Sequence, residues 1–204
     1  MSDIRDNKLI NALLWPFSHL PDDYVVLDTE TTGIFDEEGA PGILSIGIVR
    51  VKNRTIDSTI KVNVKPHRPV LEEAFRIHGI SNELAQSYPE FAAQWETIRQ
   101  QLDDQLIIIH NAAFDWPLLL DHIHRYKTEP PLISGIFCSQ RSAQPWATAM
   151  NLKCSARGPS LDTLTEALGI EDLRAKNYGL HGADIDATQT VSVIEVFRQI
   201  AGYT

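Results

Sequence analysis

Three short segments of the chain carry acidic or histidine side chains at spacings that could do chemistry. The first is Asp28-Thr29-Glu30, which ends an apolar run. Residues two apart in a strand point to the same face, so both carboxylates would project together and repel each other unless a cation compensates them. Hard carboxylate oxygens of this kind suit Mg²⁺ or Mn²⁺. The spacing alone is weak evidence, because Asp36-Glu37-Glu38 repeats it nearby, in a segment that we expect to be a solvated loop.

The second segment, HNAAFD, runs from His110 to Asp115, and the third, HGADIDA, begins at His181. Asp115 follows an apolar run and would lie at the C-terminal edge of a sheet, where α/β sites tend to form, although it could also simply favour a first helical turn. Asp184 and Asp186 would point about 200° apart on a helix, so we expect one ligand candidate and one solvated acid. An unperturbed histidine titrates near roughly 6.5, which suits His181 to act as a general base.

Length and composition indicate a single globular domain. The chain has 204 residues, of which 43% are hydrophobic and 22% charged, and it contains no apolar run long enough for a membrane span. The N-terminus lacks the basic start of a secretion signal, and two cysteines are too few for a disulfide scaffold, so we expect a cytoplasmic protein. The net charge of −9 leaves two alternatives. Either the partner is not nucleic acid, or the acids include metal ligands and the phosphate contacts are few and local.

Periodicity predicts the elements that position these side chains. Strands are expected first and alternating helices and strands afterwards, which is the order of an α/β domain with a mixed sheet. We expect a helical extension over residues 1–22, including a short amphipathic helix over 4–14, and a single domain over 23–204. The expected strands are Tyr24–Asp28, Leu44–Val51, Ile60–Val64 and Leu106–Ile109, with a tight hairpin at Asn53-Arg54. The expected helices are Glu72–His78, Pro89–Leu102, a segment running to about Tyr126, and a C-terminal helix through Ala187, Val191, Ile194 and Phe197.

Taken in order, the segments VLDTETTG, HNAAFD and HGADIDA resemble the three motifs of the DEDDh (DnaQ-like) 3′–5′ exonuclease family. That family includes the epsilon subunits of bacterial replicative polymerases, ribonuclease T, exonuclease X and oligoribonuclease. The segments LSIGIV, RIHGIS and SLDTLTEALGI add to the similarity, which extends from about Asp23 to Phe197. The resemblance implies a ribonuclease-H-like α/β fold, with a mixed five-stranded sheet and helices on both faces.

The resemblance also implies a role for each matching residue. Asp28, Glu30 and Asp186 would hold one divalent ion, and Asp115 with Asp28 would hold a second, the ions being Mg²⁺ or Mn²⁺. His181 would be the general base. The positions expected to bind the 3′-terminal nucleotide are Thr31, His78 and Asn111.

Several other residues have less specific signals. His122 and His124 lie beside an acid, but we expect both to be solvated. Trp116 and Trp146 flank site segments and are candidates for base stacking, although most tryptophans are expected in the core. Residues 138–160 hold Arg141, Lys153 and Arg157 and no acid, so this stretch is either a phosphate-contacting loop or an ordinary solvated connection.

The resemblance implies an enzyme that releases nucleoside 5′-monophosphates from single-stranded or frayed 3′ ends, with DNA favoured over RNA. RNA trimming and a non-catalytic adaptor are the alternatives, and retention of all five catalytic positions argues against the adaptor. A polymerase or a repair complex is a candidate partner. Because the sequence ends soon after the last predicted helix, we expect a stand-alone enzyme or one that binds such a partner through its surface.

Overall fold

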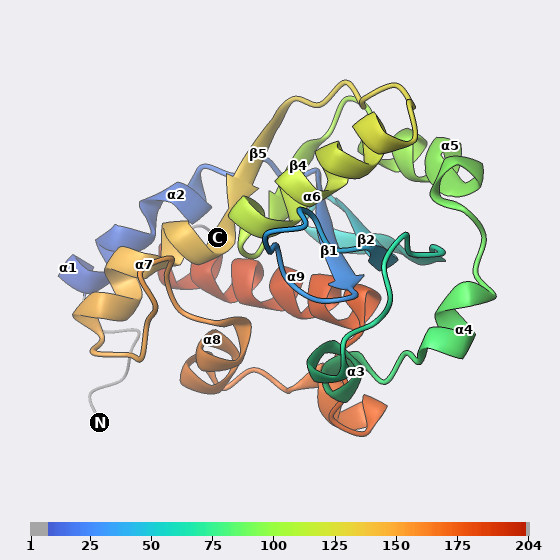
Figure 1. Ribbon diagram of the computed structural model, residues 1–204. Helices are drawn as coiled ribbons and strands as arrows, with labels where there is room; N and C mark the ends of the chain where they lie inside the picture. The colour runs from blue at the N-terminus through green and yellow to red at the C-terminus, as the bar shows by residue number, and fades with distance from the viewer. Residues whose placement is uncertain (1–7, 203–204) are drawn as a thin grey trace.

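The computed structural model describes residues 8–202, which form one five-stranded sheet flanked by helices (Figure 1). The strand order is β3-β2-β1-β4-β5. β1 pairs antiparallel with β2, and β2 pairs antiparallel with β3, whereas β4 runs parallel to both β1 and β5. This confirms the predicted mixed sheet. The strands are β1 (Tyr24–Thr31), β2 (Ile43–Lys52), β3 (Thr55–Asn63), β4 (Leu106–Ile109) and β5 (Gly135–Cys138).

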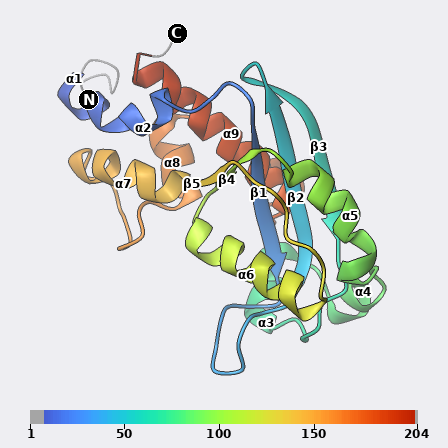
Figure 2. The same ribbon diagram turned by 90° about the horizontal axis from the view of Figure 1, so that it is seen from above.

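Helices cover both faces of the sheet, as predicted. In Figure 2, α9 runs along one side of the strands, and α5 and α6 lie on the other. The helices are α1 (Lys8–Asn11), α2 (Trp15–Ser18), α3 (Glu72–His78), α4 (Asn82–Gln86), α5 (Phe91–Leu102), α6 (Ala112–Arg125), α7 (Ser139–Ala149), α8 (Leu161–Leu168) and α9 (Ala183–Ile200), with 3₁₀ turns η2 (Ala12–Leu14) and η3 (Leu173–Asn177).

Strand alternation divides the hydrophobic core into two layers. Val26 and Ile108 pack on the face that carries α9 and its buried Phe197, whereas their neighbours Val25 and Ile107 pack on the face that carries α5 and α6. All five side chains are fully buried. A sheet covered on both faces explains why β1 and β4 read as nearly continuous apolar runs.

The predicted hairpin lies between β2 and β3. Asn53 and Arg54 both have positive φ, at 49° and 64°, which is the conformation of a two-residue turn matched to the strand twist. Each backbone N–H of the turn is satisfied by the segment before β1: Asn53 donates to the Asp23 carboxylate at 2.8 Å, and Arg54 donates to the Asp22 carbonyl at 3.0 Å.

Some predicted boundaries were wrong. The helix expected from Pro89 begins at Phe91, because the Pro89 carbonyl instead accepts a hydrogen bond from the Lys65 N–H at 2.7 Å. β3 begins at Thr55, before the predicted Ile60; its first residues are exposed and so show no apolar alternation. The N-terminal segment is divided into α1, η2 and α2, and residues 4–7 of the predicted helix lie outside the described residues.

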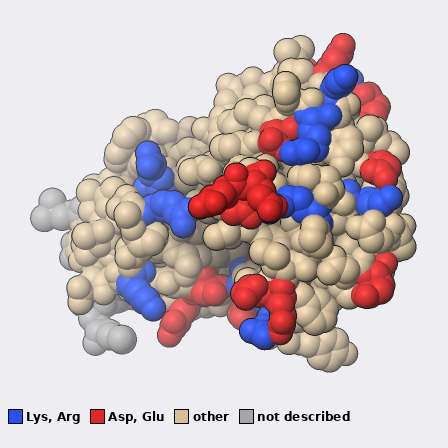
Figure 3. All heavy atoms as spheres, viewed as in Figure 1, with Lys and Arg blue, Asp and Glu red and all other residues tan. Residues whose placement is uncertain are grey.

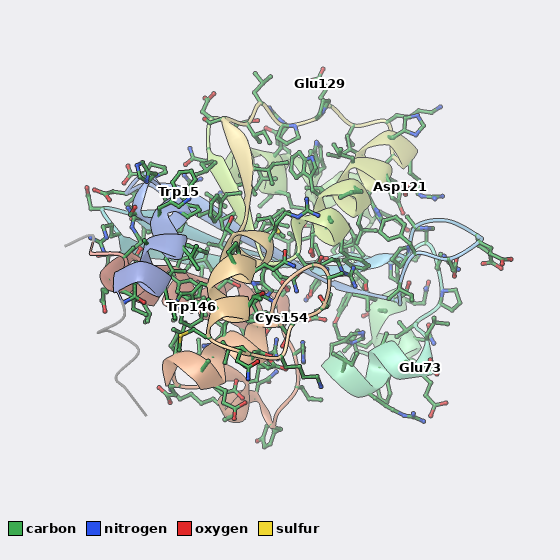
Figure 4. All side chains as sticks on the ribbon, turned by 90° about the vertical axis from the view of Figure 1, so that its left-hand side faces the viewer. Trp15, Glu73, Asp121, Glu129, Trp146 and Cys154 are labelled. Atoms are coloured by element: carbon green, nitrogen blue, oxygen red, sulfur yellow. The ribbon has the colours of Figure 1, made fainter. Side chains whose placement is uncertain are left out.

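Two side chains expected at the surface or in a stacking role belong to the core. His122 is 1% exposed: its Nε2 accepts the Ile43 N–H at 3.1 Å, and its Nδ1 lies 3.0 Å from the Leu118 carbonyl. His124 is exposed, as predicted. Trp146 of α7 is fully buried against Phe197 and cannot stack on a base, whereas Trp15, also labelled in Figure 4, is 62% exposed.

The segment before β1 is held against α9 by a buried arginine. Arg198 is fully buried, and its guanidinium donates to the Leu20 and Pro21 carbonyls and to the Asp22 carboxylate at 2.7–3.0 Å. The division at residue 22 into an extension and a domain stays a prediction.

The first turn of α9 lies directly on β2 at Gly47. A Cβ at this position would lie 2.1–2.3 Å from backbone atoms of Ala183 and Asp184, which is far inside van der Waals contact. Only a residue without a side chain therefore lets α9 begin here. Since Gly47 pairs with Asp28 of β1, this contact brings the start of α9 close to the end of β1.

We expect Gly47→Ala to destabilise the protein by about 3 kcal/mol or more, because backbone rather than a flexible side chain blocks the added methyl. Thermal unfolding followed by circular dichroism measures the loss. Gly135→Ala in β5 is the matched control, since its new methyl would meet only Leu106 Cδ1 at 3.6 Å. Equal stability of the two variants would contradict the proposed contact.

Candidate functional site

A pocket of about 290 Å³ opens where β1, α6 and α9 meet. We call it the carboxylate pocket. It contains all five predicted catalytic residues and Asn111, but not Thr31 or His78. Its lining residues are Asp28, Thr29, Glu30, His110, Asn111, Phe114, Asp115, Gln140, Ser160, Leu161, Asp162, Arg174, His181 and Asp186.

Local structure explains why the acids converge. Asp28 and Glu30 are two apart in β1 and share a face, as predicted. Asp115 lies in the first turn of α6, and Asp186 lies in the first turn of α9. The two positions that the sequence suggested for Asp115, the edge of the sheet and the start of a helix, are therefore the same place. Glu30, Asp115 and Asp186 are only 4–6% exposed. Asp184, by contrast, pairs with Lys61 at 3.1 Å at the surface.

Burial and mutual repulsion shift the carboxyl groups toward their neutral forms. Burial, together with the Asp186 charge, raises the pKa of Glu30 to about 7. Burial also raises the pKa of Asp115 to about 7. The pKa of Asp28 is raised well above its ordinary range by burial and then by the charges of Asp115, Asp186 and Glu30. Without a compensating cation, this cluster is therefore costly to ionise.

Arg174 supplies a positive charge inside the carboxylate pocket. Its Nε and Nη2 donate to the two oxygens of Asp186 at 2.7 and 2.8 Å, and its Nη1 donates to Asp162. Burial would raise the pKa of Asp186, but hydrogen bonds from His181 and Arg174 hold it below its ordinary value. Sequence reasoning missed Arg174; the available signal, a basic residue shortly before the third motif, is weak.

His181 completes this network. Its Nδ1 lies 3.0 Å from Asp186 Oδ2, and this contact raises the pKa of the imidazole. The backbone N–H of His181 donates to the Ile77 carbonyl at 3.0 Å, and this bond fixes the loop before α9 against the end of α3.

Two further residues lie beside the first turn of α6, at the edge of the carboxylate pocket. Thr29 Oγ1 donates to Asp115 Oδ1 at 2.6 Å, a contact that sequence reasoning did not anticipate. Asn111 has φ 71°, in the left-handed region, and occupies the N-cap position of α6 without a capping hydrogen bond from its side chain. Among the described residues its buried Oδ1 has no hydrogen-bond partner, so this amide is free to meet a ligand.

Thr31 and His78 lie together but outside the carboxylate pocket. His78 is 7% exposed; its Nδ1 accepts the Ile80 N–H at 3.0 Å, so Nε2 donates to the Thr31 carbonyl at 3.1 Å. Both ring nitrogens are therefore occupied: Nε2 ties α3 to the end of β1, and Nδ1 holds the turn that follows α3. Substrate binding by Thr31 and His78 stays a prediction.

The donor set fits a hard divalent cation. Ligand atoms of Glu30, His181 and Asp186 lie within 4.8 Å of one another. Glu30 Oε1 is buried with no hydrogen-bond partner among the described residues. Carboxylate oxygens are the ligands that Mg²⁺ and Mn²⁺ prefer, and an unpartnered buried carboxylate oxygen is costly unless an ion meets it.

The second copy of the acidic triplet is a surface loop. Asp36, Glu37 and Glu38 are exposed, and Arg68 pairs with the first and third at 2.7 and 3.0 Å. This confirms the expectation that the second triplet lies in a solvated loop, whereas Asp28-Thr29-Glu30 lies near the end of a buried strand.

A ribonuclease-H-like sheet with acids near the end of β1 and in the first turns of α6 and α9 defines a class of nucleic-acid hydrolases, and comparison with known proteins agrees. Residues 25–194 match the family model described as "RNase_T: Exonuclease". The chain belongs to this exonuclease family.

Relatives and solved structures point the same way. The chain is 33% identical over 168 residues to the DNA polymerase III epsilon subunit of Escherichia coli K12, covering 80% of this chain and 66% of that protein. It is 31% identical over 172 residues to the Pasteurella multocida epsilon subunit, covering 82% and 64%. The chain thus spans just under two thirds of these relatives.

The fold matches exonuclease X in complex with 5′ overhanging duplex DNA (TM-score 0.56, 21% identity, 88% of this chain and 99% of that one). It also matches E. coli exonuclease I in complex with a dA16 oligonucleotide (TM-score 0.67, 18% identity, 90% and 43%). None of the helices in residues 8–202 has the length and apolar content of a membrane span.

Glu30→Gln is expected to stabilise the metal-free protein at high pH. Folding raises the pKa of Glu30 from 4.5 to about 7. The free energy of unfolding therefore falls as pH rises through this interval, and the lost stability is not regained at higher pH. In EDTA the variant should melt roughly 5 °C above the wild type at pH 8 and less than about 2 °C above it at pH 5.

Glu37→Gln, at an exposed position of the second triplet, is the control and should change neither melting temperature. A Glu30→Gln protein that is no more stable than the wild type at pH 8 would refute the assignment of Glu30 to a repelling cluster.

Proposed function

We propose that this chain is a 3′–5′ exonuclease that hydrolyses the terminal phosphodiester of a nucleic acid and releases nucleoside 5′-monophosphates. The observation that carries the proposal is the convergence of four carboxyl groups and His181 on one pocket in a member of the exonuclease family. A non-catalytic adaptor would have no use for this costly cluster.

Asp28, Glu30, Asp115 and Asp186 would hold two divalent ions, Mg²⁺ or Mn²⁺. When bound there, such ions activate the attacking water and stabilise the leaving 3′-oxygen. Arg174 neutralises Asp186 in the absence of metal, and its guanidinium competes with a bound ion for the charge and lone pairs of the two Asp186 oxygens. We therefore propose that Arg174 is the counter-charge of the metal-free state.

His181 would act as the general base. When its Nδ1 donates to Asp186, its Nε2 keeps a lone pair and can accept the proton of the attacking water. The contact with Asp186 also orients the ring. Asn111, with its unpartnered amide oxygen at the pocket wall, is suited to hold the terminal nucleotide.

DNA is the favoured substrate. The epsilon subunits that resemble this chain belong to DNA polymerases by name, and the similar exonuclease X and exonuclease I structures contain DNA. Parallel assays on single-stranded DNA, duplex DNA and RNA of one sequence test this preference, since a 2′-hydroxyl is read by pocket shape and a few hydrogen bonds. Faster cleavage of RNA than of both DNAs would reverse it.

Asp186→Asn should abolish Mg²⁺-dependent shortening of a 5′-labelled oligonucleotide, leaving less than about one thousandth of the wild-type rate, because a metal ligand is lost. Asp28→Asn should do the same. Asp184→Asn is the matched control: it removes an acid from the same helical turn, but one that pairs with Lys61 at the surface. Activity of Asp186→Asn close to that of Asp184→Asn would exclude the ligand assignment.

His181→Ala should lower the rate by about 100-fold or more, the usual contribution of a general base, while Mn²⁺ binding followed by calorimetry stays near that of the wild type. His124→Ala removes an exposed imidazole from α6 and should leave both quantities unchanged. If His181→Ala lost Mn²⁺ binding and rate in parallel, the residue would be a ligand rather than a base.

A further inference from the structure

The chain carries a net charge of −9, so acids outnumber basic residues. Most basic side chains that the structure describes are accordingly paired with acids. Ion pairs hold Lys52 of β2 and the basic residues of β3, α3, α5 and α9, for example Lys52 with Asp57 and Arg99 with Asp103, whereas the half-buried Arg50 of β2 donates to Gln101. Among the exposed Lys and Arg side chains in the described part of the chain, those that form no ion pair are Lys127, Arg141, Lys153 and Arg157. Three of these four lie within residues 138–160, which contain no acid.

This segment is not the loop expected from the sequence. It contains the end of β5, the whole of α7 and a return loop that folds back onto the first turns of α7. Gln144 Nε2 donates to the Ala156 carbonyl at 3.3 Å, and Gln140 Nε2 donates to the Pro159 carbonyl at 3.0 Å. Gly158 has φ 125°, and a Cβ there would lie 2.4 Å from the Gln140 carbonyl oxygen, so helix and loop are in direct contact.

The fold-back brings the basic residues to one border of the carboxylate pocket. Gln140 and Ser160 line that pocket, and Arg141 and Arg157 are their near neighbours in the chain. Arg157 is held in a tight turn in which Ser155 and Gly158 exchange backbone hydrogen bonds at 3.0 and 3.1 Å. Lys153 lies earlier in the same return loop, between α7 and this turn. We call Arg141, Lys153 and Arg157 the basic border. In Figure 3, blue side chains lie over α7 and the loop that follows it, on the left of the view.

The loop between β1 and β2 has the opposite charge. It presents the exposed acids Asp36, Glu37 and Glu38, which form the red cluster near the centre of Figure 3. Arg68 compensates only part of this charge. A polyanion whose end enters the carboxylate pocket is therefore repelled by the β1–β2 loop and attracted by the α7 side.

We propose that the basic border binds backbone phosphates of the single strand upstream of the bond that is cleaved. This inference rests on the proposed function and adds to it the path of the substrate. Arginine suits this task, because its guanidinium donates to two phosphate oxygens at once. Neither Arg141 nor Arg157 forms an ion pair with an acid among residues 8–202, so these donors are available to a phosphate. Since the contacts are to phosphate, they recognise chain length and charge rather than base sequence.

The test compares substrates that can and cannot reach the basic border. The variant Arg141→Gln/Lys153→Gln/Arg157→Gln is assayed with Mg²⁺ on a 5′-labelled 15-nucleotide single strand and on a dinucleotide, which carries only the scissile phosphate. We expect kcat/KM on the long strand to fall about 10- to 100-fold, mainly through KM, and on the dinucleotide to stay within about twofold. The slope of log kcat/KM against log salt should become shallower by about 2, as expected for three lost contacts to a single strand.

Lys52→Gln/Lys65→Gln/Lys127→Gln is the matched control, because it removes the same charge from other parts of the surface and should change neither the chain-length dependence nor the salt slope. Equal losses on both substrates, or an unchanged salt slope, would overturn the proposal. Fluorescence anisotropy of the labelled strand in EDTA separates the two levels of inference. If the wild type cleaves neither substrate, the proposed function fails. Weaker strand binding by the basic-border variant, with unchanged binding by the control variant, would even then support the proposal that the basic border binds the strand.

Discussion

Repulsion among buried carboxyl groups is the constraint on which the rest of the site depends. Glu30, Asp115 and Asp28 all have pKa values raised by burial, and for Asp28 and Glu30 the neighbouring acids add to the shift. Asp186 escapes this shift only because Arg174 and His181 bond to it. Repulsion among these carboxyl groups therefore destabilises the metal-free protein, and a divalent cation would remove this repulsion. In the metal-free state the Arg174 guanidinium reduces it.

The scaffold forces the acids together despite this cost. The carboxylates come from three elements, and α9 reaches the end of β1 only because Gly47 lets its first turn lie on β2. The first turn of α6 is held to β1 by the hydrogen bond from Thr29 to Asp115, and Asn111 precedes this turn in a left-handed conformation. The two hydrophobic layers hold these elements together and thereby keep the charged groups from separating. Electrostatic strain at a site is tolerated when the surrounding packing is strong.

Much of this arrangement could be predicted from the sequence, and the failures have physical reasons. β4 and α3 were predicted to the residue, because a bounded apolar run and a bounded amphipathic run are local signals. The three motifs gave the acids of the pocket because strand ends and helix starts bring them to one edge. Arg174, Thr29 and the burial of His122 could not be predicted, because each depends on a partner at least 12 residues away in the chain. The exposed start of β3 was missed because it has no apolar alternation.

The carboxylate pocket is thus proposed to be a divalent-metal site whose charge Arg174 balances when no metal is bound. Calorimetric titration of the wild type and of Arg174→Gln with Mn²⁺, together with their melting temperatures in EDTA, measures both parts of this proposal. We expect the variant to bind Mn²⁺ more tightly, because a competing cation is gone, and to melt at a lower temperature in EDTA. A variant that binds Mn²⁺ more weakly than the wild type, or that is equally stable without metal, would contradict it.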